Sequence, residues 1–487
     1  MLAPPFGAPR TSLGPAPRRP RKKEAAISRP EQIAPLLARV AARHGLPPVV
    51  LPAMLAEWLT GNDAAPPSEA LLDRKAADFL ALARRLTAPL DDLDIRRLRA
   101  EAAAAIAAGR LGEADKALAK TELHLIGNVN DLSALSAASR LRIGENRADR
   151  AALSFLRAAP EAYREAAARY GEASALIGLV DIDRSREVAL EQARSLARIS
   201  EDFGGRDGYD AAAAALRRLL DGLDSLEDTV AFAEVQEALA GALEGLVQVT
   251  GDKALQDEAL AHCRRGLEHF DRHEAPALWR ALKLRLGRLA LILGKRQQDE
   301  MLLEEAISAF ATVLAGWDRS NDEALWLGAE HMIARARTVL GSRRNDLALL
   351  ERAFNGLNRV AGAVDRSREP LRWAELQDQM GSVLAAMGER YSEPVVVEEA
   401  IATFAMALEE RRREAQPLLW AQTRTAQAEA MLLLARRSKD PELAQRALAQ
   451  MVEAVETARK ADRGSIAAEL QKRLAIAGEQ AGRLLAK

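Results

Sequence analysis

The side chains best suited to metal binding or nucleophilic chemistry lie close together near the middle of the chain. His262, Cys263, His269 and His273 fall in one expected helix, and His269 and His273 share a helix face because they are four residues apart. Imidazole and thiolate groups at such spacing could ligate zinc. Cys263, however, falls on the apolar side of the expected helix. We therefore interpret the histidines as surface residues, and we expect no metal site and no cofactor.

Sequence motifs for catalysis are absent. The chain contains no G-x-x-x-x-G-K-[ST] loop for nucleotide phosphates, no G-x-S-x-G nucleophile turn and no H-E-x-x-H zinc motif. The single cysteine, Cys263, excludes an intrachain disulfide and a multi-cysteine zinc site. A buried thiol is also a poor nucleophile. We therefore expect that the protein is not an enzyme.

Tryptophan, which is rare in this chain, recurs at a fixed interval of 47 residues. The series is Trp279, Trp326, Trp373 and Trp420, and it contains four of the six tryptophans. A fixed interval of this length indicates a repeat protein. Indole rings could stack on bases or aromatic ligands, but each of these falls on the apolar stripe of its helix. We therefore interpret them as a structural ladder that packs neighbouring repeats in register.

Phe232 stands 47 residues before Trp279 and extends the ladder by one position. The positions two, five and nine residues after each ladder position vary between repeats and share one helix face. They supply the candidate partner-binding residues Glu234, Glu237, Arg288, His331, Arg335, Glu375 and Asp378. If this face lines a groove, the groove has an acidic start, a basic centre at Arg288 and Arg335, and an acidic far side. A peptide with a carboxylate opposite the two arginines would suit that pattern. The alternative is a solvated face with no partner.

The repeat unit itself predicts a pair of packed helices. In the unit that begins at Trp373, apolar residues at helical spacing predict a first helix over 373–387, which Gly388 ends, and a second helix over 396–413. Gly381 and Ala400 are small where the two helices must cross closely. One such pair cannot bury its apolar faces alone, so neighbouring pairs must stack.

These positions resemble the tetratricopeptide repeat. The first helix of that family carries a Leu-Gly pair, which is similar to Leu286-Gly287 and Met380-Gly381 here. Its second helix carries an alanine, an aromatic and a small residue, a pattern similar to Ala306, Phe310 and Val313 and to Ala400, Phe404 and Ala407. The family's usual unit has about 34 residues, so the chain resembles a long bacterial variant. The proline that often follows the second helix is replaced by Asp318, Asp365 and Arg412. The resemblance implies a right-handed α-solenoid that binds peptides on its concave face.

Composition favours an all-helical chain. Of the 487 residues, 48% are hydrophobic but only 4% are aromatic, and no convincing alternating strand pattern occurs. We expect a disordered, basic, proline-rich tail over 1–30, a helical region over 31–127, degenerate repeats over 128–184, the solenoid over 185–466 and a capping helix over 467–487. In the first helical region we expect helices near 31–44, 48–60, 68–87, 92–108 and 112–126.

The charge distribution adds one alternative function. The net charge is −1, whereas the first 30 residues carry seven Lys or Arg against one Glu, with a basic cluster at 18–23. Such a tail could contact nucleic acid, or it could only aid solubility. No apolar stretch is long enough for a transmembrane helix or follows a secretory pattern. The sequence therefore favours a cytoplasmic protein, and the composition suits a bacterial origin.

We interpret the chain as an adaptor or scaffold that binds a protein or peptide through a tetratricopeptide-like solenoid. Two alternatives stay open. One is a nucleic-acid-associated regulatory protein that uses the basic tail. The other is a ligand sensor or enzyme with a site in residues 31–170, which a deep pocket with converging titratable groups would support.

Overall fold

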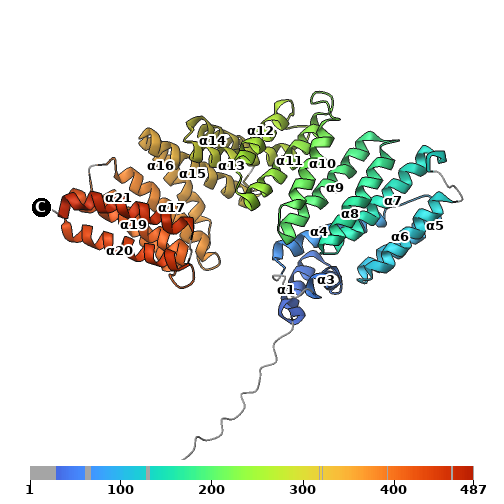
Figure 1. The fold of residues 1–487 in the computed structure, drawn as a ribbon, viewed down its shortest axis with the longest axis horizontal. Coiled ribbons are helices and arrows are strands. Elements are labelled where there is room, and N and C mark those ends of the chain that lie inside the picture. Colours follow the sequence, from blue (N-terminus) through green and yellow to red (C-terminus); the bar gives the residue numbers. More distant parts are fainter. Residues whose placement is uncertain are drawn as a thin grey trace, which may run out of the picture. The chain divides into compact units, whose positions relative to one another are not determined.

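A computed structural model of the protein describes residues 29–60, 67–127, 132–316, 319–320, 322–391, 393–461 and 464–485. These residues form 21 α-helices and one short 3-10 helix, with no β-strand among them (Figure 1). The expected all-helical repeat fold is thus confirmed for the described ranges. The expected tail lies outside them, apart from its last two residues, which begin the first helix. Contacts divide the chain into two compact units, one ending at Asp181 and the other beginning at Ile182.

The N-terminal unit contains eight α-helices and the 3-10 helix. Their bounds are α1 Arg29–His44, α2 Val50–Met54, α3 Ala56–Thr60, α4 Glu69–Leu86, α5 Leu93–Ala107, α6 Leu111–Ile126, η1 Leu132–Ala134, α7 Ala137–Leu156 and α8 Pro160–Ile177. The expected single helix over 48–60 is wrong, because the chain breaks at Leu55 into α2 and α3. Helices α5, α6, α7 and α8 pack in chain order, and α4 packs against α1, α5 and α7.

The C-terminal unit is an array of six helix pairs and a final helix. The first helices of the pairs are α9 Ile182–Phe203, α11 Thr229–Thr250, α13 Pro276–Gln297, α15 Glu323–Arg344, α17 Pro370–Gly388 and α19 Pro417–Ser438. The second helices are α10 Asp207–Leu220, α12 Ala254–Glu268, α14 Glu300–Ala315, α16 Leu347–Gly362, α18 Val395–Glu410 and α20 Pro441–Ala461, and α21 Ser465–Leu485 follows.

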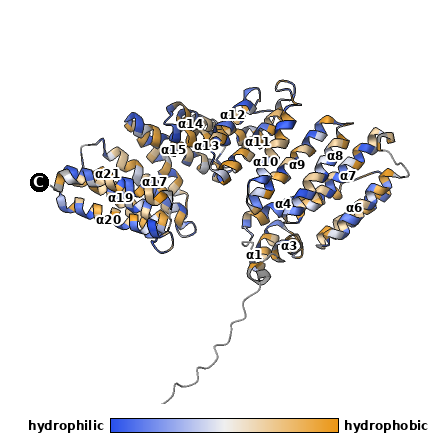
Figure 2. Cartoon of the chain, in the orientation of Figure 1, coloured by the Kyte–Doolittle hydropathy of each residue, from blue (hydrophilic) through white to orange (hydrophobic). Residues whose placement is uncertain are grey.

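Packing within the array is sequential. Each helix packs on the next, and each first helix also contacts the first helix of the following pair, whereas the second helices make no comparable contact with one another. The first helices therefore lie on the more crowded, inner side of the array. Figure 2 shows hydrophobic and hydrophilic residues interspersed along the helices of both units.

Small residues set the distance between the two helices of a pair. A Cβ atom added at Gly287 would lie 2.8 Å from the Phe310 ring, and one added at Gly381 would lie 2.9 Å from the Phe404 ring. Both phenylalanines are almost fully buried. The close crossing expected at Gly381 is confirmed, because any side chain there would push the two backbones apart.

The helix ends follow capping rules with one correction. Proline occupies the first turn of α13, α17 and α19, where its missing N–H costs nothing. Gly388 is the last residue of α17, as expected. The equivalent Gly294 and Gly341 lie inside α13 and α15. The left-handed residues that cap these helices stand four positions later, at Gln298 and Asn345.

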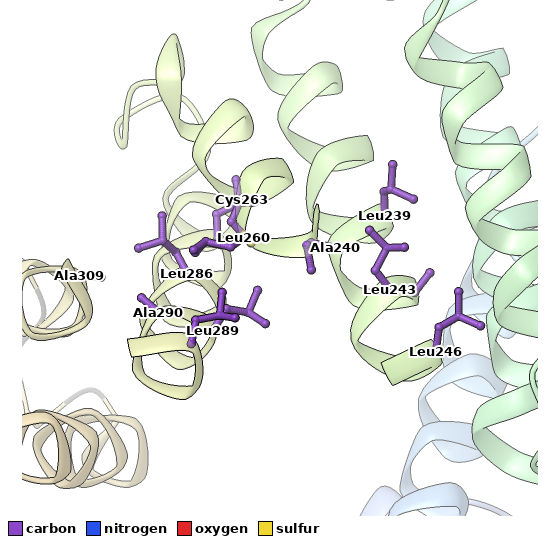
Figure 3. Packing of buried hydrophobic residues seen from close by; sticks show 14 of the residues in the cluster. Leu239, Ala240, Leu243, Leu246, Leu260, Cys263, Leu286, Leu289, Ala290 and Ala309 are labelled. Carbon is purple, nitrogen blue, oxygen red and sulfur yellow. The ribbon is translucent and has the colours of Figure 1, made fainter. Parts of the chain in front are cut away.

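The core of the array crosses from one pair to the next. Its largest cluster runs from α9 to α15 and includes buried leucines and alanines from both helices of each pair. Figure 3 shows this packing between α11, α12 and α13, with Leu243, Leu260 and Leu286 among the labelled side chains. Because each pair shares its core with its neighbours, the first helices are held at fixed positions, and so are the polar side chains on their inner face.

Candidate binding face of the first helices

The four ladder tryptophans are half-buried, and each lies beneath a cation. The rings belong to the apolar clusters between pairs. Lys283 lies over Trp279 with 5.6 Å between its nitrogen and the ring centroid. For the other three, the guanidinium carbons of Arg319, Arg366 and Arg413 lie 5.0, 4.2 and 5.1 Å from the centroids of Trp326, Trp373 and Trp420.

These three arginines form a second ladder that our sequence analysis missed. Each stands seven residues before its tryptophan, so they repeat at the same interval of 47. A cation within about 6 Å of a ring centroid stabilises the pair. With one face against the core and the other under an arginine, an indole offers no open face to a stacked ligand.

The acidic start of the expected groove is neutralised inside the array. Arg285 on α13 donates from Nη2 to Glu237 Oε1 on α11 at 2.7 Å, and it also pairs with Glu244. Only 18% of the Arg285 side chain is exposed. Glu234 lies nearby on α11, where burial raises its pKa. Arg285 stands six residues after Trp279, a position that our choice of variable positions did not include.

The middle of the face carries a hydrogen-bonded chain of three side chains. His331 Nε2 on α15 lies 2.6 Å from Gln379 Oε1 on α17, and Gln379 Nε2 donates to Glu375 Oε1 at 3.0 Å. Burial lowers the pKa of His331, which favours the neutral imidazole. The structure thus places His331 and Glu375 in one polar network between neighbouring first helices.

Asp378 belongs to a buried ion pair and not to an open acidic surface. Its Oδ2 lies 3.2 Å from Arg411 Nη1. The Arg411 side chain is only 6% exposed, and its Nη1 also donates to Thr423 Oγ1 at 2.6 Å. Asp378 therefore compensates a buried charge at the junction of α17, α18 and α19.

The basic centre is the part of the expected groove with unmatched charge. Arg288 is about half exposed, and its only carboxylate among the described residues is Glu244 at 3.7 Å, which Arg285 already binds. Arg335 on α15 contacts Met332 Sδ at 3.7 Å, and no carboxylate of the described ranges lies within 4.0 Å of it. Lys295 likewise has no such partner there.

Lys295 joins Arg288 and Arg335 in one cationic patch. On α13, residues 288 and 295 are seven apart, so they share a face. Burial of part of the side chain, and then the positive charges of Arg335 and Arg343, lower the pKa of Lys295. Arg343 is itself engaged, because it donates to the carbonyl oxygens of Gly294 at 3.0 Å and Lys295 at 3.1 Å. We call Arg288, Lys295 and Arg335 the cationic patch.

An apolar side chain lies within the cationic patch. Ile292 stands between Arg288 and Lys295 on the same face of α13, and 45% of it is exposed. Val339 holds the equivalent position on α15 and is half-buried. The patch therefore combines positive charge with a small apolar surface.

A second arginine series also repeats at this interval, and the sequence analysis missed it too. Arg296, Arg343 and Arg390 are 47 residues apart. Arg343 and Arg390 donate to carbonyl oxygens in the last turn of the preceding first helix, those of Gly294 and Lys295 and of Ser342. Arg296 donates to the carbonyl oxygen of Lys253, in the turn before α12. Cations at helix C-termini complement the unpaired carbonyl groups. These arginines hold the array together and are not available to a ligand.

The histidine and cysteine cluster does not form a metal site in the described ranges. Helix α12 ends at Glu268, so our expectation that all four residues share one helix is wrong: His269 and His273 lie in the following turn and are exposed. Our interpretation of the histidines as surface residues is wrong for His262, which is buried with Nδ1 2.6 Å from Gln236 Oε1. Cys263 is fully buried, as expected, and burial raises the pKa of its thiol to about 12. No group of three potential ligands is found in the described part of the chain.

Comparisons with known proteins extend the fold assignment little. No protein-family model matches the sequence, and no curated protein matches it. Among solved structures, a designed circular tandem repeat protein with novel repeat topology and enhanced subunit contact surfaces is 17% identical, with 84% of this chain and 94% of that chain covered and a TM-score of 0.24. A computationally designed self-assembling cyclic homooligomer is 15% identical, with 75% and 97% covered and a TM-score of 0.09.

At these TM-scores the two likenesses carry no argument about function. The helical-repeat architecture rests on the helix pairs of the chain itself, and membership of the tetratricopeptide-repeat family stays a prediction. No helix within the described ranges is long and apolar enough to cross a lipid bilayer.

Proposed function

We propose that the protein is a scaffold that binds a protein or peptide partner through the first-helix face of its array, with the cationic patch as the anchor. The observation that supports this proposal is the unmatched charge of Lys295 and Arg335. Elsewhere on the face, Arg285 binds two glutamates, and Asp378 binds Arg411. Lys295 and Arg335 have no carboxylate within 4.0 Å among the described residues.

The chemistry of the patch defines the partner segment. Arginine binds carboxylates through paired N–H groups, and such charge-assisted hydrogen bonds are about twice as strong as neutral ones. Ile292 offers a place for an apolar side chain. The segment that fits is therefore short and acidic, with a Leu, Ile or Phe close to its carboxylates.

Peptide display on the full chain tests this function. We expect peptides selected on the wild-type protein to be enriched in Asp or Glu next to a large apolar residue. The double variant Arg288→Glu/Arg335→Glu should lose that enrichment, and a selected peptide should bind it at least about tenfold more weakly. Arg352→Glu, a charge reversal at an exposed arginine on the second helix α16, is the matched control and should behave as wild type.

Thermal unfolding shows whether the variant is still folded: Arg335 has no carboxylate within 4.0 Å among the described residues, and Glu244, which lies 3.7 Å from Arg288, keeps its ion pair with Arg285. All three proteins should unfold at similar temperatures. If the double variant selects the same acidic peptides as the wild type, the patch is not the binding site and the proposal is wrong. The alternative role in nucleic-acid binding rests on residues 18–23, which lie outside the described residues, and it stays a prediction.

A further inference from the structure

The N-terminal unit contains a cavity that the scaffold role does not use. It has a volume of about 330 Å³ and lies where the end of α4 meets α5, α6 and α7. Its lining surface is mostly apolar, and Leu90, Ile95, Leu125 and Leu141 contribute to it beside charged and polar residues. Ligand sites in proteins are concave and mostly apolar, with volumes from about 300 Å³ upward. The cavity therefore has the size and the wall of a small-molecule site.

The charged groups at this cavity are balanced. Arg85, Arg99 and Arg142 face three acidic residues, Asp92, Glu145 and Asp149. The Asp149 side chain is 5% exposed, and its carboxylate forms ion pairs with Arg85 Nε at 2.9 Å and with Arg99 Nη1 at 2.8 Å. Asp92 accepts the backbone N–H groups of Asp94 and Ile95 as the N-cap of α5. Because the positive and negative groups at the cavity balance one another, we expect its ligand to be uncharged.

Two polar atoms at the cavity are nevertheless left without a partner. Asn146 is 1% exposed, and its Nδ2 donates to the carbonyl oxygen of Leu118 at 2.9 Å, but its Oδ1 accepts no hydrogen bond in the described part of the chain. The Arg99 Nε–H is buried and has no acceptor among the same residues. A buried polar atom without a partner is unfavourable, because it has lost its hydrogen bonds to water. One is an acceptor and the other is a donor.

Asn146 and Asp149 lie on one face of α7 because they are three residues apart. Both are buried and polar in a helix whose other buried residues are mostly apolar or small. A helix that only needed to pack would carry apolar residues at these positions. Asp149 is already paired with two arginines, whereas Asn146, which also lines the cavity, keeps an unpaired acceptor.

We infer that this cavity binds a small uncharged molecule with an apolar body and a head group that both donates and accepts hydrogen bonds, such as a primary amide. The head group donates to Asn146 Oδ1 and accepts from Arg99 Nε, and the body contacts Leu125 and Leu141. Buried water could satisfy the same two atoms, and the experiment below separates that outcome from ligand binding.

Displacement of a fluorescent probe tests the inference on the full chain. The neutral dye N-phenyl-1-naphthylamine is bound first and is then displaced with octanamide, octanoate or octylamine. Octanamide should displace it at a concentration at least about tenfold lower than either charged analogue, since both charged head groups would enter a site whose charges are already paired. Equal displacement by all three compounds would show that the cavity does not recognise the head group, and no saturable displacement would leave water as the only occupant. Either result would overturn the inference.

Two variants locate the binding in the cavity. Leu141→Trp places a larger side chain on the cavity wall and should abolish displaceable dye binding, whereas Leu123→Trp alters an exposed residue on α6 and should not. Asn146→Leu should retain dye binding but reduce the preference for octanamide to less than about threefold. If Leu141→Trp fails to fold, as judged by circular dichroism, the Asn146→Leu preference decides alone. An unchanged preference there would sink the inference. Peptide capture by the cationic patch is measured separately and does not depend on this result.

Discussion

The guanidinium group of Arg366 lies over the indole of Trp373, with 4.2 Å between its central carbon and the ring centroid. The same arginine donates to Glu409 and Glu410 on α18, at 2.7 Å in each case. It thus joins the loop before α17 to the second helix of that pair. The apolar face of Trp373 packs in the cluster shared with the preceding pair. One tryptophan and one arginine therefore connect two successive repeats.

Truncation of Trp373 should weaken this connection. We expect Trp373→Ala to lower the free energy of unfolding of the array by about 2 kcal/mol, below the 3–5 kcal/mol of a fully buried tryptophan because the ring is half-buried. Urea unfolding followed by circular dichroism measures this loss. Arg366→Ala should lower the midpoint less, because 43% of its side chain is exposed and water screens its ion pairs. A larger effect for Arg366→Ala would show that the packing role assigned to the indole is wrong.

Alanine substitution at two glycines of the first helices should have opposite effects. Gly381→Ala places a Cβ atom 2.9 Å from the Phe404 ring, which is buried and cannot move away. We expect a loss of about 1–3 kcal/mol in the free energy of unfolding. Gly328, inside α15, has nothing within 4 Å of an added Cβ. Gly328→Ala should therefore stabilise by up to about 1 kcal/mol through helix propensity. Equal effects in urea unfolding would contradict the close crossing.

Periodicity made the fold predictable. The apolar spacing and the 47-residue interval predicted helix pairs, and α17 and α18 lie within a few residues of the expected bounds. The break at Leu55 was not predictable from the apolar pattern, because that pattern continues through it. The end of α12 before His269 was missed for a similar reason: no proline or glycine marks it, so the helix was extended too far.

The candidate site was less predictable because charge pairing between repeats depends on three-dimensional distance. Glu237 and Asp378 fall on the expected helix face, yet each is bound to an arginine from another helix. The partner of Glu237, Arg285, could have been found by asking which arginine lies about one repeat away. Lys295 and Arg335, by contrast, have no carboxylate within 4.0 Å among the described residues, so the positive charge of the cationic patch is not neutralised within the array.

Left-handed residues at the ends of first helices should tolerate or prefer glycine. Gly251, Gln298, Asn345 and Lys439 have φ angles of 71°, 58°, 55° and 55°, and they occupy the same position in their repeats. Such a φ costs a residue with a side chain about 1–2 kcal/mol. We expect Lys439→Gly and Gln298→Gly to raise the free energy of unfolding by about 0.5–1 kcal/mol.

The control for this series is a helix end with ordinary geometry. Glu389 caps α17 with a φ of −59°, so Glu389→Gly should lower the free energy of unfolding by about 0.5–1 kcal/mol. Asn345→Gly should gain less than Lys439→Gly, because asparagine tolerates the left-handed region and Asn345 Oδ1 also accepts from Arg390 at 2.7 Å. Destabilisation by Lys439→Gly would mean that its backbone is not left-handed in solution.

The buried thiol of Cys263 should make stability fall at high pH. Burial raises the pKa of Cys263 from 9.0 to about 12 in the folded state. Above pH 9 the unfolded chain releases the thiol proton and the folded chain retains it, so ionisation stabilises the unfolded state. The free energy of unfolding should therefore decrease between about pH 9 and pH 12, by at most about 1.4 kcal/mol per pH unit from this group.

Comparison with Cys263→Ala isolates that contribution, because lysine, tyrosine and arginine titrate in the same range in both proteins. The wild type should be more stable than the variant at pH 8, since the sulfur fills core space, and this advantage should shrink as the pH rises to 10.5. Thiol labelling with an aromatic disulfide gives an independent check: the folded protein should react slowly at pH 8, and urea-unfolded protein should react at once. A constant stability difference across this pH range, or fast labelling of the folded chain, would show that Cys263 is accessible to solvent.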